Sequence, residues 1–145
     1  MDPIVARSIA TATHIDQRTR SGELLLEHLR RVAEAVAPEE RATAWLHDAL
    51  ERSDTTVEQL RAHGLTAVER DALQLLTHSP TESWEVYVLR IAHAPGPAGR
   101  LARDIKLADL DDHQRRAPLL GDPPYAWGRR HIANAVSGHR ASAVA

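Results

Sequence analysis

The sequence has no cysteine and no phenylalanine, and Lys106 is its only lysine. The absence of cysteine excludes disulfide bonds, zinc–thiolate centres and thiol nucleophiles. No apolar run approaches the roughly 18 residues that a membrane-spanning helix needs, and the first twelve residues lack the apolar core of a secretory signal. A formal net charge of -2 argues against a nucleic-acid partner. We therefore expect a cytoplasmic protein that binds neither membranes nor nucleic acid.

What is present is typical of one globular domain: 145 residues, of which 43% are hydrophobic and 26% charged. Apolar residues recur at helical spacing, and strand-like alternation is nearly absent. The pattern predicts an all-α, single-domain bundle of seven or eight helices in residues 1–137, followed by a flexible tail in 138–145. Proline, glycine and capping residues place the helices at about 3–18, 23–37, 38–52, 57–62, 66–77, 81–94, 98–115 and 125–136.

Two histidines and two aspartates fall on the more apolar sides of predicted helices: His28, the adjacent pair His47 and Asp48, and Asp109. An ionised carboxylate in apolar surroundings costs several kcal/mol unless it is paired or bound to a metal. Together the four side chains form a mixed nitrogen and oxygen set that suits manganese, iron or a similar divalent ion. The alternatives are chance proximity among nine histidines, and a simple ion pair of Asp109 with Lys106 one helical turn earlier.

Three blocks of residues carry a family resemblance. Residues 12–23 read ATHIDQRTRSGE with His28 following, residues 44–56 read AWLHDALERSDTT, and residues 105–110 read IKLADL, with Leu76 and Thr77 between the last two. In this order and spacing they resemble the hydrolase domain of the RelA/SpoT family over residues 10–113. The resemblance implies an HD-type helical domain, and a manganese-dependent enzyme that removes the 3′ pyrophosphate from guanosine tetraphosphate (ppGpp).

The resemblance also implies a role for each matching residue. His28, His47, Asp48 and Asp109 would hold the divalent metal ion, with Mn²⁺ as the expected metal. Asp48 and Glu51 would be catalytic, since Glu51 follows His47 by one helical turn and would orient or deprotonate a metal-bound water. The remaining expected residues are basic and would bind the phosphates of a small-molecule nucleotide substrate: Arg18, Arg20, Arg52 and Lys106.

Several positions depart from the family pattern. Arg52 replaces an acid that belongs to the catalytic pair, and Thr19 replaces an arginine associated with the guanine base. Other departures replace a tyrosine, two prolines and an asparagine: Leu25, Leu24, Leu29 and His113. None removes a metal ligand. Two alternatives therefore stand beside the first: an HD phosphohydrolase for a different nucleotide, and a nucleotide-binding HD module without turnover.

Overall fold

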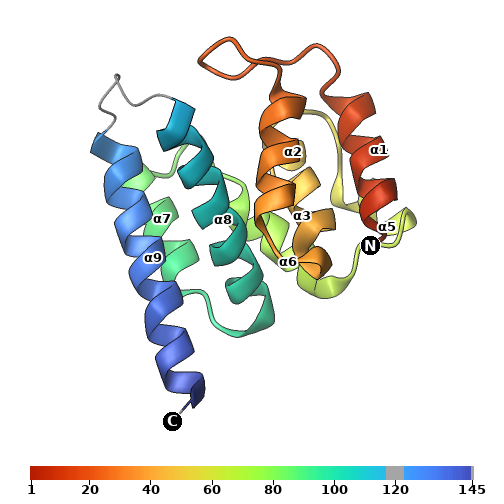
Figure 1. Cartoon of the computed structure of the whole chain (residues 1–145). Coiled ribbons are helices and arrows are strands. Elements are labelled where there is room, and N and C mark those ends of the chain that lie inside the picture. Colours follow the sequence, from red (N-terminus) through yellow and green to blue (C-terminus); the bar gives the residue numbers. More distant parts are fainter. Residues whose placement is uncertain (117–122, 145) are drawn as a thin grey trace.

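The computed structural model describes residues 1–116 and 123–144, and over these ranges it contains nine α-helices, one 3-10 helix and no β-strand. Figure 1 shows their arrangement. In chain order they are α1 (Pro3–Thr13), α2 (Leu25–Ala35), η1 (Pro38–Glu40), α3 (Arg41–Leu46), α4 (Ala49–Arg52), α5 (Val57–Ala62), α6 (Ala67–Leu76), α7 (Trp84–His93), α8 (Gly96–Arg116) and α9 (Pro123–Val144). The predicted all-α bundle is confirmed. Among the described helices, none is both long and apolar enough to cross a membrane.

Capping residues fix where several helices begin. The Asp2 carboxylate accepts hydrogen bonds from the backbone N–H groups of Ile4 and Val5, and Pro3 occupies the first turn of α1. Thr66 and Glu69 form a capping box at the start of α6, in which each side chain binds the other residue's backbone N–H. These local signals lie in the sequence itself, so the helix starts were predictable.

The first helix was predicted too long. Instead of continuing to residue 18, α1 ends at Thr13, and residues 14–24 form a loop. The loop is held by backbone hydrogen bonds, including those from Leu25 N to the Gln17 carbonyl and from Thr19 N to the Glu23 carbonyl. These hydrogen bonds give the backbone N–H and C=O groups of the loop the partners that a longer helix would have given them.

The predicted helix over 38–52 is divided into η1, α3 and α4, and the break falls on His47 and Asp48. The ring Nδ1 of His47 lies 2.8 Å from the Ala44 carbonyl, an oxygen that the helical ladder would otherwise use. At the other end of the chain, α9 continues to Val144, whereas a tail was expected from residue 138. Ala141 and Ala143 favour helix in this segment, and Gly138 alone costs only about 1 kcal/mol in a helix.

The buried apolar residues form two clusters. One joins α1 through α6 with Leu25, Leu29, Leu46 and Leu73 among its members, and the other extends through α7, α8 and α9. Helices α2, α3 and α6 contribute to both clusters, and α8 packs against α2, α6, α7 and α9. In Figure 1, α2 and α8 therefore lie side by side in the middle of the molecule. Polar side chains on their facing surfaces are removed from water.

Candidate metal centre

The four predicted ligands come from three segments that meet between the two apolar clusters. His28 projects from α2, His47 and Asp48 lie at the break between α3 and α4, and Asp109 projects from α8. His28, His47 and Asp109 are buried, with 2%, 4% and 4% of their surface exposed. Asp48 is partly buried. Burial of so many titratable groups at one place requires that they compensate one another or a bound ion.

The distances between ligand atoms suit one ion. The Oδ1 atom of Asp109 lies 3.2 Å from His28 Nε2 and 3.9 Å from His47 Nε2, and His47 Nε2 lies 3.5 Å from Asp48 Oδ1. In an octahedral arrangement with each ligand atom about 2.1 Å from the ion, neighbouring ligand atoms would be about 3 Å apart and opposite ones about 4.2 Å apart. The three observed separations fall inside that range. The structure thus brings together all four residues that the sequence predicts as ligands.

The ring of His47 is set up as a ligand. Its Nδ1 lies 2.8 Å from the Ala44 carbonyl, to which it can only donate, so in the neutral ring the lone pair is on Nε2. Nε2 is buried and has no hydrogen-bond partner among the described residues. It faces carboxylate oxygens of Asp48 and Asp109 that, like itself, carry lone pairs. A cation between them would satisfy all three groups.

His28 is held from behind by a network of charges. Its Nδ1 lies 2.8 Å from Asp112 Oδ2, and the Asp112 carboxylate accepts two hydrogen bonds from Arg31, which is in turn paired with Glu23. Burial alone would raise the pKa of Asp112, but the hydrogen bonds from Arg31 and His28 lower it to about 2. A carboxylate behind a ligand histidine orients the ring and makes it a better donor to a metal.

The same carboxylates act on the protonation of His28. Burial opposes a charge on its ring, but the hydrogen bonds to Asp109 and Asp112 and the negative charges of Asp109 and Asp48 outweigh burial and raise the pKa of His28 to about 9. In the absence of a metal ion, His28 is therefore protonated at neutral pH and its positive charge compensates the buried carboxylates. A metal ion would take over this compensation and displace the proton.

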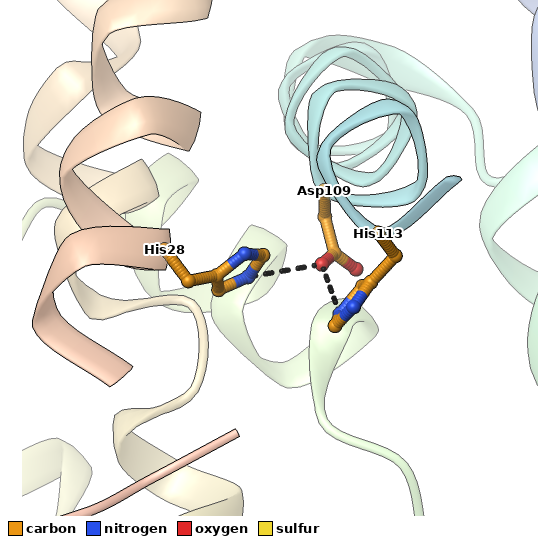
Figure 2. Close-up of side chains that lie close together, drawn as sticks. All are labelled: His28, Asp109 and His113. Carbon is orange, nitrogen blue, oxygen red and sulfur yellow. Dashed lines mark ion pairs between the residues drawn. The ribbon is translucent and has the colours of Figure 1, made fainter. Parts of the chain in front are cut away.

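Asp109 is the centre of the cluster. Its Oδ2 lies 2.7 Å from the ammonium of Lys106, so the pairing considered from the sequence is present. Its Oδ1 faces both His28 and His113 (Figure 2), with His113 Nε2 at 3.1 Å. Burial alone would raise the pKa of Asp109, but the charge of Lys106 and the hydrogen bonds from His113 and His28 hold it well below its usual value. Asp109 is thus ionised under all ordinary conditions.

Lys106 is largely enclosed by aromatic rings. Its Nζ lies 5.0 Å from the ring centre of Tyr87 and 5.4 Å from that of Trp84. Burial alone would lower the pKa of Lys106, but Asp109 raises it, so the ammonium is retained. The ammonium of the chain's only lysine is therefore paired with Asp109. Its predicted contact with a substrate phosphate stays a prediction.

The predicted catalytic residue Glu51 lies in α4, on the far side of the break from His47, and its side chain is exposed. Its Oε2 accepts a hydrogen bond of 2.9 Å from the backbone N–H of His78. The helix break means that Glu51 does not sit one regular turn above His47, as the sequence suggested. Its carboxylate is nevertheless held by the backbone N–H of His78 and is open to solvent.

Arg52 joins the cluster to the loop of residues 14–24. Its Nη1 lies 3.6 Å from Asp48 Oδ2, its Nη2 donates to the Arg18 carbonyl at 3.0 Å, and its own carbonyl accepts from Gln17 Nε2 at 3.0 Å. We call the two hydrogen bonds between residue 52 and this loop, from Arg52 Nη2 to the Arg18 carbonyl and from Gln17 Nε2 to the Arg52 carbonyl, the loop clasp. Arg18 itself is exposed and donates to the Gly22 carbonyl, and Arg20 is exposed on the same loop. Of the expected phosphate-binding arginines, Arg52 thus contacts the predicted ligand Asp48, and Arg18 and Arg20 lie on the loop that Arg52 holds.

The sequence did not assign Asp112 or Arg31 to the site, and it treated His113 only as a departure from the family. Asp112 and His113 follow Asp109 by three and four residues, the spacing that places helical side chains on one face. That spacing was a usable signal. Arg31 offered none, because it reaches Asp112 across the contact between α2 and α8.

Comparison with models of protein families finds no match, and comparison with curated proteins finds no significant match. The likeness to the RelA/SpoT hydrolase domain thus rests on the motifs alone. Function has to be argued from the chemistry of the site.

Proposed function

We propose that this protein is a metal-dependent phosphohydrolase of the HD type, acting on a phosphorylated nucleotide. The observation that supports this most strongly is the buried Nε2 of His47, which has no hydrogen-bond partner among the described residues and faces carboxylate oxygens of Asp48 and Asp109. Acceptor atoms that face one another in a buried site repel each other unless a proton or a cation lies between them, and one divalent cation can contact all three groups. A divalent ion would supply Lewis acidity toward a phosphoryl oxygen and a water of lowered pKa.

The protein side chains divide the remaining work. His28, His47, Asp48 and Asp109 hold the ion, while Asp112 orients His28 through Nδ1. Glu51 orients the attacking water and accepts its proton, and the backbone N–H of His78 keeps that carboxylate in place.

A phosphate-rich substrate fits the charges around the cluster. Arg18, Arg20 and Arg52 lie on or beside the loop next to Asp48, and Lys106 adds a positive charge on the α8 side. Arginine suits phosphate because its planar donors match two phosphate oxygens at once. The first candidate substrate is ppGpp, from which the enzyme would remove the 3′ pyrophosphate. We infer a cytoplasmic enzyme without a nucleic-acid or membrane partner.

A second candidate keeps the metal and changes the nucleotide, for example to a phosphorylated dinucleotide or a nucleoside monophosphate. The observation that favours it is the position of Arg52, 3.6 Å from Asp48, where the family pattern has an acid. A positive charge there competes with the metal for Asp48 and changes which leaving group is stabilised. A nucleotide-binding module without turnover is the third possibility.

The test is release of pyrophosphate from ppGpp by the purified protein with manganese, alongside Asp48→Ala and Arg52→Asp. We expect metal-dependent release that Asp48→Ala lacks, and faster release with Arg52→Asp. Release with another nucleotide alone would support the second candidate. If the wild-type protein binds metal but hydrolyses none of a panel of nucleotides, the proposal of an enzyme is wrong and the binding module remains.

A further inference from the structure

His113 is a histidine of α8 that the four-ligand centre does not use. It follows Asp109 by one helical turn, and its Nε2 lies 3.1 Å from Asp109 Oδ1. Figure 2 shows the rings of His28 and His113 both directed at the same carboxylate oxygen of Asp109. One ligand atom from each of His28, Asp109 and His113 lies within 4.8 Å of the other two. Such proximity is compatible with three ligands of one ion.

The ring of His113 is held in place although it is partly exposed. It stacks on Tyr125 of α9, with ring centres 5.3 Å apart and an angle of 15° between the planes. Its centre also lies 4.7 Å from that of His28. Contact with two rings limits rotation of the imidazole, so Nε2 stays directed at Asp109.

A second set of three ligands shares His28 with the first. His28, His47 and Asp48 also offer ligand atoms within 4.8 Å of one another. Asp109 Oδ1 links the two sets, since three imidazole Nε2 atoms lie 3.1, 3.2 and 3.9 Å from it. The unpartnered Nε2 of His47 is an independent indication that an ion belongs at this point.

We propose that His113 is a fifth protein ligand of the metal centre, so that three imidazoles and two carboxylates hold the ion. This inference rests on the metal centre of the proposed function. Five protein ligands would leave a six-coordinate ion one open position, to be taken by the attacking water or by a phosphoryl oxygen. A third imidazole also shifts preference away from Mn²⁺ toward Fe²⁺, Co²⁺ or Zn²⁺, which bind nitrogen more strongly.

The experiment measures metal affinity and coordination in the purified, metal-stripped protein. Co²⁺ and Mn²⁺ are titrated by calorimetry, and the visible spectrum of the Co²⁺ form is recorded, for the wild type, His113→Asn and Asp48→Ala. His93→Asn removes an exposed histidine outside the cluster and serves as the matched control. Far-ultraviolet circular dichroism checks that each variant folds.

The expected result is one tightly bound Co²⁺, a loss of at least about 10-fold in Co²⁺ affinity for His113→Asn, and a smaller loss for Mn²⁺. The Co²⁺ spectrum should change in His113→Asn and stay unchanged in His93→Asn. If His113→Asn keeps the wild-type affinity and spectrum while Asp48→Ala loses binding, His113 is not a ligand and the four-ligand centre stands. If the wild type binds neither ion, both proposals fail.

A second measurement needs no variant. Pulsed electron paramagnetic resonance of the Mn²⁺ form detects directly coordinated imidazole nitrogens. Three coupled imidazoles support the five-ligand centre, and two overturn it. The result holds even if His113→Asn does not fold.

Discussion

The two sides of the candidate centre differ in how completely their polar groups are compensated. On the α8 side, Asp109 is paired with the buried ammonium of Lys106, and Asp112 is paired with Arg31. On the side of the α3–α4 break, His47 Nε2 has no hydrogen-bond partner among the described residues, and the cation nearest to Asp48 there is the partly exposed Arg52 at 3.6 Å. On the α8 side, both carboxylates have a cationic partner without a bound ion, whereas on the other side His47 Nε2 has no hydrogen-bond partner among the described residues.

The two sides are therefore expected to contribute differently to the stability of the metal-free fold and to cation binding. The α8 side contributes to the stability of the fold, because its charges compensate one another when no ion is bound. The side with His47 is expected to contribute less to stability and, under the proposed function, to make the site specific for a cation. Substitutions on the two sides should therefore have different effects on the metal-free protein, although both abolish metal binding.

The largest expected effect comes from Asp109→Asn. It leaves the buried Lys106 ammonium without a carboxylate and should lower the free energy of unfolding of the metal-free protein by about 3–5 kcal/mol. His47→Ala should cost only about 1–2 kcal/mol, since it removes one hydrogen bond and a small buried volume. Urea denaturation of both variants, stripped of metal, measures the difference.

Metal titration completes that comparison, and both variants should fail to bind Co²⁺ at concentrations that saturate the wild type. Equal losses of stability in the two variants would show that the two sides are not divided as described. Wild-type metal affinity in His47→Ala would remove His47 from the ligand set.

Glu51→Gln tests the role of a carboxylate that lies outside the ligand set. The variant should bind metal with unchanged affinity and lose turnover by roughly 10²–10⁴-fold, because the amide cannot accept a proton from water. Steady-state kinetics on whichever nucleotide the wild type hydrolyses measure the loss, and calorimetry measures metal binding. Full activity in Glu51→Gln would assign proton transfer to another group.

A further expected effect is a dependence on pH. The pKa of His28 is raised from 6.5 to about 9, so its protonated form stabilises the metal-free fold fully below pH 6.5, and this contribution is lost as the pH rises through 9. The urea midpoint of the metal-free protein should fall between pH 6.5 and 9.5, while metal affinity should rise over the same range because the ion displaces that proton.

His28→Gln, which cannot be protonated, is the control for the pH dependence, and its urea midpoint should change less over this range. An unchanged midpoint in the wild type would mean that Asp109 and Asp112 do not hold a proton on His28.

Much of the fold was predictable from the sequence because its signals are local. Asp2 and Thr66 mark helix starts through contacts with residues two or three positions away, and prolines mark boundaries through their own geometry. The C-terminal end of α1 and the break between α3 and α4 were not predictable in this way. The break depends on a hydrogen bond of the His47 ring, and the ring adopts that position within the folded cluster.

The candidate site was likewise predictable only where its signals are local. The four predicted ligands were identified because motifs mark them, and His113 could have been identified because it follows Asp109 on one helix face. Arg31 was not, because its contact with Asp112 spans 81 positions in the chain. Sequence spacing also placed Glu51 on a regular turn above His47, and the helix break shows why spacing alone misplaced it.

The loop clasp has a consequence for how this sequence can change. Arg52 contacts Asp48 and the backbone of residue 18, and Gln17 binds the carbonyl of residue 52, so positions 17, 18 and 52 are linked by hydrogen bonds. A substitution at position 52 alters the charge beside the centre and also removes the side-chain hydrogen bond to the loop that carries Arg18 and Arg20. Its effects should be non-additive with those of changes in the loop. Substitutions at these positions are therefore expected to be tolerated in combination more readily than one at a time.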